Sequence, residues 1–514
     1  MEGSRFAFNG LDRIKMTPGL EKRFEEIESI AKDMGLDPFP IVFEEVPRET
    51  IWDVASYGLP LRMGHWSFGR SFLHQKMHGE MGFSKIYELI INNNPSIAFL
   101  DETNSEATNL LIAAHCYGHS HYFKHNLLFA PTNRNMVNQA EANARQIDSY
   151  KEKYGVDEVE NWMDIGFALD AHIDPRLGEN RAKYPPPAHS YREIKPLPFA
   201  DLWGESTKPH VIEKAGDFSL PPHPERDILW FLINYAPLLP WQREVLTLIR
   251  SEAFYFYPQG QTKISNEGAA CFFHAEIMLN YWNLKPEEHL EFSHSHSAIV
   301  RPGGGGSLNP YYVGFRIFGD IRKRWDKAFE AGKKDSEFLS SKAVDAFDDK
   351  GNIVKSKIDG MAKVLKVVAE DDDVSFVSNY LTRDLCEDMK LFVYGQDGDS
   401  EDPDDDDIII KDREFEAVKN ALVGRLHNNG APPVRIMKAD ESGLYLRHDH
   451  SDPLTLDKRY TNETLKYIYA AWKRPVFLET RDADGEPVTY FANSKGVAIK
   501  EKSDEGENMV KVRI

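Results

Sequence analysis

The chain has few cysteines, no long apolar run and no apolar leader at its start. Its three cysteines, Cys116, Cys271 and Cys386, are too few to form a disulfide framework and fit a reducing compartment. No stretch of about 18 apolar residues occurs, so we expect no membrane span. The first residues, MEGSRFAFNG, lack the basic segment followed by an apolar one that marks a secretory signal. We therefore expect a cytoplasmic protein.

Basic residues are also fewer than acidic ones. Lysine and arginine number 62 against 82 aspartates and glutamates, which gives a formal net charge of -20. A surface of that sign repels nucleic acids and anionic membranes, so we expect no nucleic-acid partner. Apolar residues (41%) and charged residues (28%) are near globular averages, and 514 residues are too many for one core. The composition predicts a folded protein with more than one domain.

The order of the sequence patterns predicts an α+β fold. Residues 17–37 carry a threonine cap, a proline in the first turn and a glycine near the end, which predicts a helix. Long aromatic-rich segments up to about residue 330 are too apolar all round for surface helices. Short strand-like and helix-like pieces with hairpin turns then alternate. We predict a mainly helical domain over 1–335 with a zincin-like core, a smaller α+β domain over 336–500, and a tail over 501–514.

Four histidines fall within one apolar segment, IAAHCYGHSHYFKHNLLF, at residues 112–129. His115 and His119 are four residues apart and share one helical face. By this geometry an H-x-x-x-H helix offers two imidazoles to one metal ion. His121 and His125 have the same spacing on a different side, and periodicity does not choose between the pairs.

A second polar stripe lies in SNEGAACFFHAEIM, at residues 265–278. Glu267 and His274 are seven residues apart and return to nearly the same helical face, where Cys271 also lies. A buried carboxylate is costly unless it lies beside a cation or is hydrogen-bonded, so a metal ion held by two histidines would suit Glu267. The alternative is a core in which the histidines bond to carbonyl or carboxylate groups, and spacing alone leaves both open.

Several blocks of the sequence carry a resemblance to a known family. They are EVPRETIWDVASYGLPLRMGHWSFGRSF, IYELIINNNPSIAFLDETNS, AAHCYGHSHYFKHN, YFYPQGQTKISNEGAACFFH, and FSHSHSAIV with LNPYYVGFRIFGDI. These blocks resemble, in the same order, the signature blocks of the stage V sporulation protein R family. The resemblance covers roughly residues 40–325, with looser similarity to about residue 470.

The resemblance implies which polar residues matter. The family carries histidine at the positions of His115 and His119, but not usually at 121 or 125. It also carries an Asn-Glu-Gly followed by a histidine, here Asn266, Glu267, Gly268 and His274. It therefore implies a metal site of His115, His119 and Glu267, with His274 as a fourth ligand or as a partner of the ligands.

The chain departs from the family pattern beside this motif. Ala269 stands where the family usually has an aromatic residue, and Cys271 where it usually has a hydroxyl residue. The first change would alter the shape of a pocket, and the second could place a thiol near the metal. His294 and His296 in FSHSH alternate in a way that suits a strand or a loop, with a chance of lining the same cavity.

The usual general base of a related metal motif is missing. In HExxH hydrolases it is the glutamate after the first histidine, but here that position is Cys116. If catalysis occurs, the base must come from elsewhere, and the candidates are Glu102, Glu252 and His65.

The resemblance implies no settled activity, because the family is named for a defect in spore cortex formation and occurs also in bacteria that make no spores. Other members are often encoded beside a serine protein kinase and a von Willebrand-type protein, which are the expected partners. The leading hypothesis is a hydrolase of an amide bond in peptide or peptidoglycan, linked to cortex formation or a stress response. We expect a divalent metal, zinc first and iron or manganese as alternatives. The rival hypotheses are a non-catalytic regulatory or assembly protein acting with the kinase, and a non-haem iron oxidoreductase.

Overall fold

The computed structural model describes residues 17–80, 89–184, 190–194, 210–214, 220–303, 308–396, 408–448, 455–482, 485–501 and 508–510. Its contacts group the chain into two compact units, and each unit is assembled from two separate stretches of sequence. Unit 1 comprises Met1–Asp157 and Phe254–Gly430, and unit 2 comprises Glu158–Ala253 and Ala431–Ile514.

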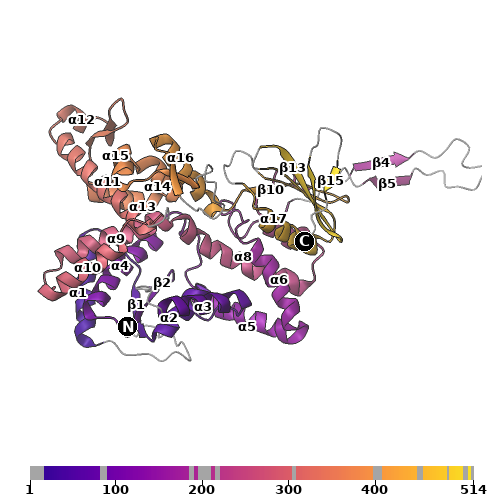
Figure 1. The fold of residues 1–514 in the computed structure, drawn as a ribbon, viewed down its shortest axis with the longest axis horizontal. Coiled ribbons are helices and arrows are strands. Elements are labelled where there is room, and N and C mark those ends of the chain that lie inside the picture. The colour runs from indigo at the N-terminus through magenta and orange to yellow at the C-terminus, as the bar shows by residue number, and fades with distance from the viewer. Residues whose placement is uncertain are drawn as a thin grey trace, which may run out of the picture. The chain divides into compact units, whose positions relative to one another are not determined.

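Unit 1 is mainly helical (Figure 1). Its helices are α1 (Pro18–Asp33), α2 (Arg48–Tyr57), α3 (Trp66–Glu80), α4 (Glu106–His125), α5 (Met136–Tyr154), α9 (Lys263–Asn280), α10 (Pro286–Ile299), α11 (Pro310–Gly332), α12 (Ser336–Ser340), α13 (Gly360–Glu370), α14 (Asp373–Tyr380), α15 (Arg383–Met389) and α16 (Phe415–Leu426), with the 3₁₀ turn His427–Gly430. Strands β1 (Ile41–Val46), β2 (Leu89–Ile91) and β3 (Ser96–Asp101) form a sheet of order β1-β3-β2, with β1 parallel and β2 antiparallel to β3. Two small hairpins pair β6 (Asp345–Phe347) with β7 (Ile353–Ser356), and β8 (Val393–Gln396) with β9 (Ile408–Asp412).

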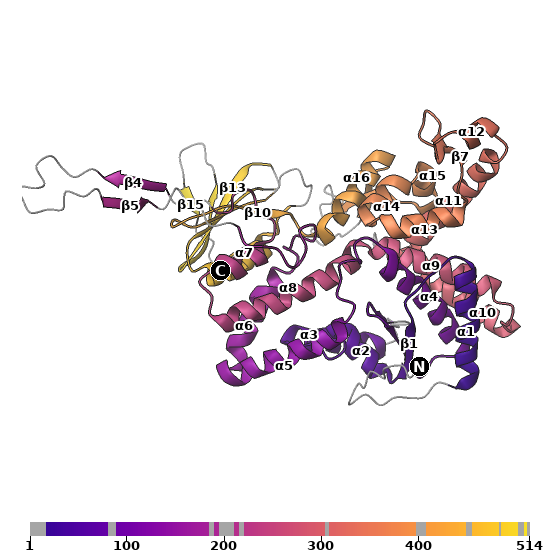
Figure 2. The same cartoon turned by 180° about the vertical axis from the view of Figure 1, so that it is seen from behind.

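The core of unit 1 is built around α4 and α9 (Figure 2). Helix α4 begins where the Ser105 hydroxyl accepts a hydrogen bond from the Thr108 N–H at 3.1 Å, and it is buried all round from Ala107 to Phe123. A helix without a solvent face must be covered on several sides, and α1, α9, α10 and α13 pack against it. Polar side chains on α4 are therefore held inside the protein, where they need partners.

Small residues let the central helices approach closely. A Cβ on Gly118 of α4 would lie 2.9 Å from the Cα of Ala270 on α9. A Cβ on Gly314 of α11 would lie 2.1 Å from the Ile264 carbonyl oxygen and 2.6 Å from the Cα of Gly268. Real Cβ atoms do not approach so near, so glycine is required at these crossings. The crossings bring the polar stripes of α4 and α9 within reach of each other.

Unit 2 contains a sheet with the helix Lys458–Trp472 packed on it. Its strands, in sheet order, are β10 (Val434–Ala439), β11 (Leu444–His448), β12 (Val476–Arg481), β13 (Pro487–Asn493), β14 (Gly496–Glu501) and β15 (Asn508–Val510). Its helices are α6 (Val156–Ala168), α7 (Ile228–Tyr235), α8 (Pro240–Gln261), whose last residues belong to unit 1, and α17 (Lys458–Trp472). Strands β11 and β12 are parallel and α17 connects them, while the other neighbours are antiparallel. Strands β4 (Ser190–Ile194) and β5 (His210–Lys214) form a separate hairpin.

The structure confirms the α+β class, with a mainly helical N-terminal region and a small sheet near the C-terminus. The expected helix at 17–37 is α1, capped by Thr17, and the two expected hairpins are β10–β11 and β12–β13. Contacts group 336–430 with the helices of unit 1, because α13 packs on α11 and α14 packs on α9. That the chain divides at residue 335 into two independently folding domains therefore stays a prediction. Within the predicted tail, β15 pairs with β14, and residues 502–507 and 511–514 lie outside the described residues.

None of the helices in the described part of the chain combines the length and the apolar character that crossing a bilayer requires.

Candidate metal site

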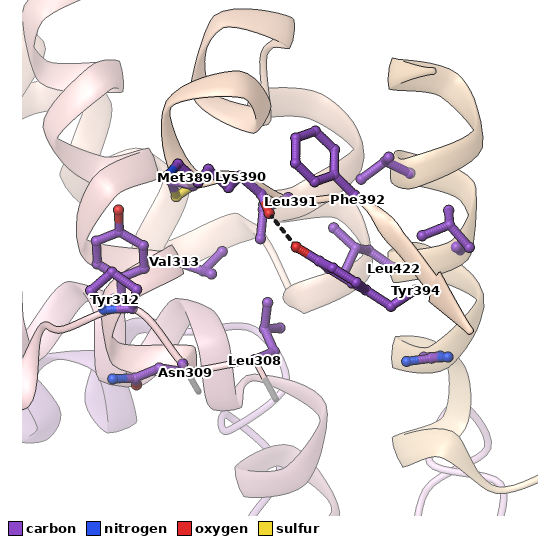
Figure 3. Close-up of a pocket in the computed structure, with 16 residues that line it drawn as sticks. Leu308, Asn309, Tyr312, Val313, Met389, Lys390, Leu391, Phe392, Tyr394 and Leu422 are labelled. Carbon is purple, nitrogen blue, oxygen red and sulfur yellow. Dashed lines mark hydrogen bonds between the residues drawn. The ribbon is translucent and has the colours of Figure 1, made fainter. Parts of the chain in front are cut away.

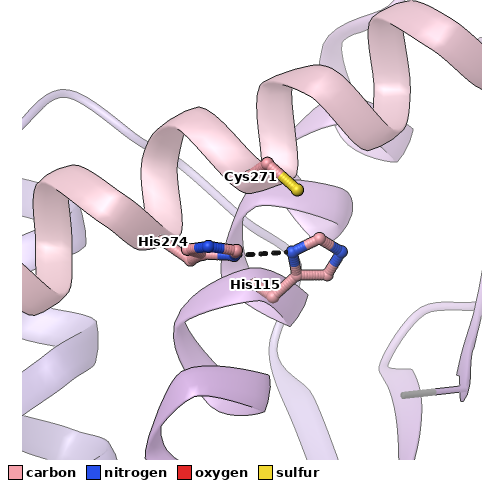
Figure 4. Close-up of side chains that lie close together, drawn as sticks. All are labelled: His115, Cys271 and His274. Carbon is pink, nitrogen blue, oxygen red and sulfur yellow. Dashed lines mark hydrogen bonds between the residues drawn. The ribbon is translucent and has the colours of Figure 1, made fainter. Parts of the chain in front are cut away.

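Two polar stripes face each other where α4 crosses α9. Helix α4 contributes His115 and His119, and α9 contributes Glu267, Cys271 and His274. These positions are four apart on α4, and four and then three apart on α9, so each set lies on one helical face. Figure 4 shows that Cys271 and His274 extend from one helix toward the ring of His115 on the other. The structure therefore brings together the four residues that the sequence predicts as metal ligands.

Three ligand atoms form a small triangle. Nε2 of His119 lies 2.9 Å from Nε2 of His115, and Oε2 of Glu267 lies 3.2 Å from the first and 3.6 Å from the second. A tetrahedral zinc ion with bonds of about 2.0–2.1 Å places its ligand atoms about 3.3–3.4 Å apart. The edges of the triangle bracket that value. The arrangement matches three ligands of one ion with little movement of the side chains.

The hydrogen bonds on the far sides of the rings fix where protons lie. Nδ1 of His119 is 2.9 Å from Oδ1 of Asn266, an acceptor, so Nδ1 carries the proton and Nε2 presents a lone pair. Nε2 of His115 therefore either holds a proton shared with His119 or shares a cation with it. Metal-ligating histidines usually donate their other ring N–H to an oxygen in this way. Asn266 thus has the position of a residue that orients a ligand.

A chain of imidazoles continues from His115. Its Nδ1 lies 2.9 Å from Nδ1 of His274, and Nε2 of His274 lies 2.7 Å from Nδ1 of His296 on α10. His274 is fully buried, and burial, with neighbouring histidines, holds its pKa well below the usual range. His274 is therefore neutral and uses both ring nitrogens in these contacts. It lies behind His115 and outside the triangle, as a partner of a ligand.

Glu267 combines a charged state with partial access to solvent. Burial acts to raise the pKa of its carboxyl, but the nearby rings of His119 and His115 more than offset this effect and lower the pKa overall. The side chain of Glu267 is 19% exposed, whereas those of His115 and His119 are 3% and 5% exposed. The site thus has two buried imidazole donors and one anionic donor, whose ligand oxygen Oε2 is itself buried.

The three candidate bases lie in different surroundings. Glu102 is exposed after β3, where its N–H donates to the Val46 carbonyl. Burial, and to a lesser extent the charge of Glu102, raises the pKa of nearby Glu45. His65 is buried before α3, with Nδ1 2.7 Å from the Ser67 hydroxyl. Glu252 is buried in α8, within unit 2. The role of each as a base stays a prediction.

For His296 the local sequence pattern predicts the wrong secondary structure. The pattern of FSHSH suggests a strand or a loop, but these residues belong to α10. The signal that could have found the helix is Pro286 followed by Glu287 and Glu288, because a proline and acids in the first turn are typical helix starts. On a helix, His296 turns inward to His274, while His294 is exposed.

Tyr311 lies beside the site, and the second histidine pair lies elsewhere on α4. The ring of Tyr311, at the start of α11, stacks at 6.4 Å on that of His115. His121 accepts a hydrogen bond from the Asp37 N–H through Nδ1 at 2.9 Å, and His125 Nε2 lies 3.1 Å from the Asp37 carboxylate. The second histidine pair therefore has hydrogen-bonding partners of its own, away from the triangle.

Asp373 of α14 fixes the start of α9. Its carboxylate accepts hydrogen bonds from the N–H groups of Ile264 and Ser265 and from the Ser265 hydroxyl, each at 2.7 Å. The first N–H groups of a helix have no partner within the helix, so Asp373 acts as a cap supplied from another helix. The capped residues directly precede Asn266 and Glu267. Asp373 thereby positions the end of α9 that completes the triangle.

We expect Asp373→Ala to lower the free energy of unfolding by about 3 kcal/mol, because it leaves two buried N–H groups without acceptors. Urea unfolding followed by circular dichroism measures the change. Asp388→Asn is the control, because Asp388 is 70% exposed and its pair with Arg316 lies at the surface. Equal stability of the two variants would contradict the capping role.

Helix α10, which carries His296, is held to α1 by a buried ion pair. Arg23 donates two hydrogen bonds to Glu288, at 2.9 and 2.8 Å, and the Lys285 N–H donates a third. The bonds from Arg23, with the smaller effect of Lys285, lower the pKa of Glu288 from 4.5 to about 2 against the opposing effect of burial. A lowered pKa stabilises the folded state above the unfolded pKa and loses that effect as the pH falls.

For Glu288→Gln we expect a loss of about 3 kcal/mol in unfolding free energy at pH 6. The deficit relative to wild type should shrink between pH 4.5 and pH 2, where wild-type Glu288 takes up its proton. Urea unfolding at several pH values measures the gap. Glu330→Gln, at an exposed pair with Lys333, should differ little from wild type at any pH. A deficit that does not change with pH would contradict the assignment.

A separate pocket of about 170 Å³ lies beside the start of α11, the segment between α15 and β8, and α16 (Figure 3). Its walls combine apolar side chains, such as those of Leu308, Val313 and Leu422, with the polar groups of Lys390 and Arg425. Tyr312 lines the pocket, whereas the preceding residue stacks on His115. No residue of the metal triangle lines this pocket.

Comparisons with known proteins agree with the blocks that surround these residues. A family model described as "SpoVR like protein" matches residues 15–431, which include all of the ligand candidates. The chain belongs to the SpoVR family. A family relative, the uncharacterized protein YcgB of Escherichia coli (strain K12), is 31% identical over 496 residues, covering 91% of this chain and 92% of its own length. No solved structure matches the chain.

The SpoVR match ends at residue 431, next to Gly430, the last residue of unit 1. The resemblance predicted from the signature blocks is thereby confirmed at the level of the family. The family name does not specify a reaction, and the relative is described as uncharacterized. The chemistry must therefore be argued from the site.

Proposed function

We propose that this SpoVR-family protein is a metal-dependent hydrolase, with one divalent ion held by Nε2 of His115, Nε2 of His119 and the carboxylate of Glu267. The observation that carries the proposal is the triangle of ligand atoms, with edges of 2.9, 3.2 and 3.6 Å. Zinc is the ion that suits two imidazoles and one carboxylate best, with iron or manganese as alternatives.

The number of ligands favours a catalytic site over a structural one. Structural zinc sites usually have four protein ligands, whereas catalytic sites have three and leave a position for water or substrate. His274 is engaged by His115 and His296, so it supports the site without closing it.

When bound, the ion would polarise a carbonyl group and lower the pKa of water, which suits hydrolysis of an amide bond in peptide or peptidoglycan. The residues around it have separate tasks. Asn266 holds His119 by accepting its Nδ1–H, and His274 accepts the Nδ1–H of His115. Neutral His274 in turn donates its own Nε2–H to His296. Both ligand rings are thus held with Nε2 directed at the ion.

The general base does not come from the HExxH position. Cys116 is fully buried there and packs in the apolar core. A base has to reach the substrate side of the site, and Glu102, Glu252 and His65 remain the proposed candidates. Their variants should lower turnover without lowering metal content, because none of them belongs to the triangle.

The same donors also suit a second reaction class. Two histidines and one carboxylate are the ligand set of many non-haem iron oxygenases, so an oxidoreductase is the alternative that this geometry favours next. A regulatory protein acting with a serine protein kinase and a von Willebrand-type protein is the non-catalytic alternative. For all three we propose a cytoplasmic location and a link to spore cortex formation or a stress response; the family match supports the link to sporulation.

Elemental analysis of the purified chain beside a His115→Ala/His119→Ala variant tests the proposal. We expect near-stoichiometric metal in wild type and none in the variant. The matched control is His121→Ala/His125→Ala, the same change at the same spacing on the same helix, which should keep its metal. Zinc would favour hydrolysis and iron the oxidoreductase. Wild type without metal after reconstitution would overturn the proposal.

A further inference from the structure

We propose that the protein holds a second ion, of a thiol-preferring kind such as zinc or copper(I), between His115, Cys271 and His274. This inference rests on the proposed function, because both sites use His115. The first site takes Nε2 of that ring, and the second takes Nδ1. The shared imidazole would then bridge the two ions.

The second group of ligand atoms also lies close together. One ring nitrogen of His115, the thiol of Cys271 and one ring nitrogen of His274 all lie within 4.8 Å of one another. The two Nδ1 atoms are 2.9 Å apart, close to the spacing of about 3.3 Å between the ligands of a tetrahedral zinc ion. Figure 4 shows the sulfur of Cys271 directed at the ring of His115. The three donor atoms are thus near enough to be drawn onto one ion by small side-chain movements.

The burial of the group determines which ion it can hold. Cys271 and His274 are fully buried and His115 is 2% exposed, so a bare dication would be costly there unless ligand charges balance it. A thiolate and a bridging imidazolate together supply two negative charges. Binding a dication would release the thiol proton of Cys271 and the proton that His115 shares with His274. The second site would therefore be neutral when filled.

The outer hydrogen bond of His274 is also typical of a metal ligand. With Nδ1 bound to the second ion, Nε2 carries the proton and donates to Nδ1 of His296 at 2.7 Å. This is the outer hydrogen bond that orients a metal-binding histidine. The polar stripe on α9 would then supply ligands to both ions. Glu267 would bind the first ion, and Cys271 and His274 the second.

Cobalt(II) titration of the metal-free, full-length chain under reducing conditions tests the inference. Cobalt reports its ligands, because a thiolate adds a charge-transfer band in the near ultraviolet. We expect two equivalents and this band in wild type. Cys271→Ser should bind one equivalent without the band, and Glu267→Gln should keep the band. Cys386→Ser is the control for loss of another buried cysteine and should match wild type.

The outcomes separate the two proposals. One equivalent without the band in wild type, lost in His119→Ala, would overturn the second ion and leave the proposed function standing. One equivalent with the band, unchanged by Glu267→Gln and His119→Ala, would overturn both the two-ion centre and the first ligand set. No cobalt binding would overturn both proposals.

Discussion

Gly314→Ala is expected to lower the free energy of unfolding by at least about 3 kcal/mol, although it adds a single methyl group. The new Cβ would lie 2.1 Å from the Ile264 carbonyl oxygen and 2.6 Å from the Cα of Gly268. Both are backbone atoms of α9, so no side chain can turn away, and the two helices must separate. Separation also moves the segment of α9 that carries Asn266 and Glu267. Thermal and urea unfolding measure the loss.

Gly319 provides a control on the same helix. A Cβ there meets nothing within 4 Å, so Gly319→Ala keeps the packing and replaces a poor helix former with a good one. We expect it to raise the free energy of unfolding by about 0.5–1 kcal/mol. The same chemical change on α11 should thus have opposite signs at the two positions. Changes of the same sign and size would show that α9 and α11 do not cross closely at Gly314.

Glu267→Gln is expected to weaken binding of zinc by at least about 100-fold, more than loss of an orienting residue costs. The change keeps the size of the side chain but removes the only anionic donor of the triangle. Ligand binding stabilises a folded protein by about 2.7 kcal/mol at 100 times the dissociation constant. On addition of zinc at this concentration, wild type should therefore gain about 2 kcal/mol more than the variant, whose first site stays half empty.

The control is Glu276→Gln, a similar change on α9 outside the triangle, which should keep the full stabilisation by zinc. Thermal unfolding with and without zinc measures all three proteins. Comparable stabilisation of wild type and Glu267→Gln would show that the carboxylate is not a ligand. The metal-free proteins serve as the reference, so that any effect of the substitution on packing is subtracted.

Helical periodicity predicted most of the candidate site. Residues four apart on α4 and seven apart on α9 share faces in any helix, so His115 with His119, and Glu267 with His274, could be paired from the sequence. Periodicity could not show whether the two faces meet, which the small residues at Gly118 and Ala270 decide. The resemblance to the family chose the first histidine pair, and the contacts of His121 with Asp37 agree with that choice.

Long-range partners could not be predicted in the same way. Asp373 caps a helix more than 100 residues earlier, and no local pattern at DDDVSF distinguishes that role from a cap for its own helix. The side of α10 that faces His274 depends on the ion pair of Glu288 with Arg23, 265 residues away. Packing between distant segments, and not local propensity, decides these contacts.

The two halves of the candidate site leave the ribosome at different times. His119 precedes Glu267 by 148 positions, and the intervening chain includes the first segment of unit 2. At about 5–20 residues per second, roughly 7–30 seconds pass between their syntheses. During that interval α4 has neither the carboxylate nor the helix that covers it, so its apolar surface and its histidines are open to other proteins and ions. Metal capture at the complete triangle must therefore follow synthesis of α9, which makes loading a late step in the maturation of this protein.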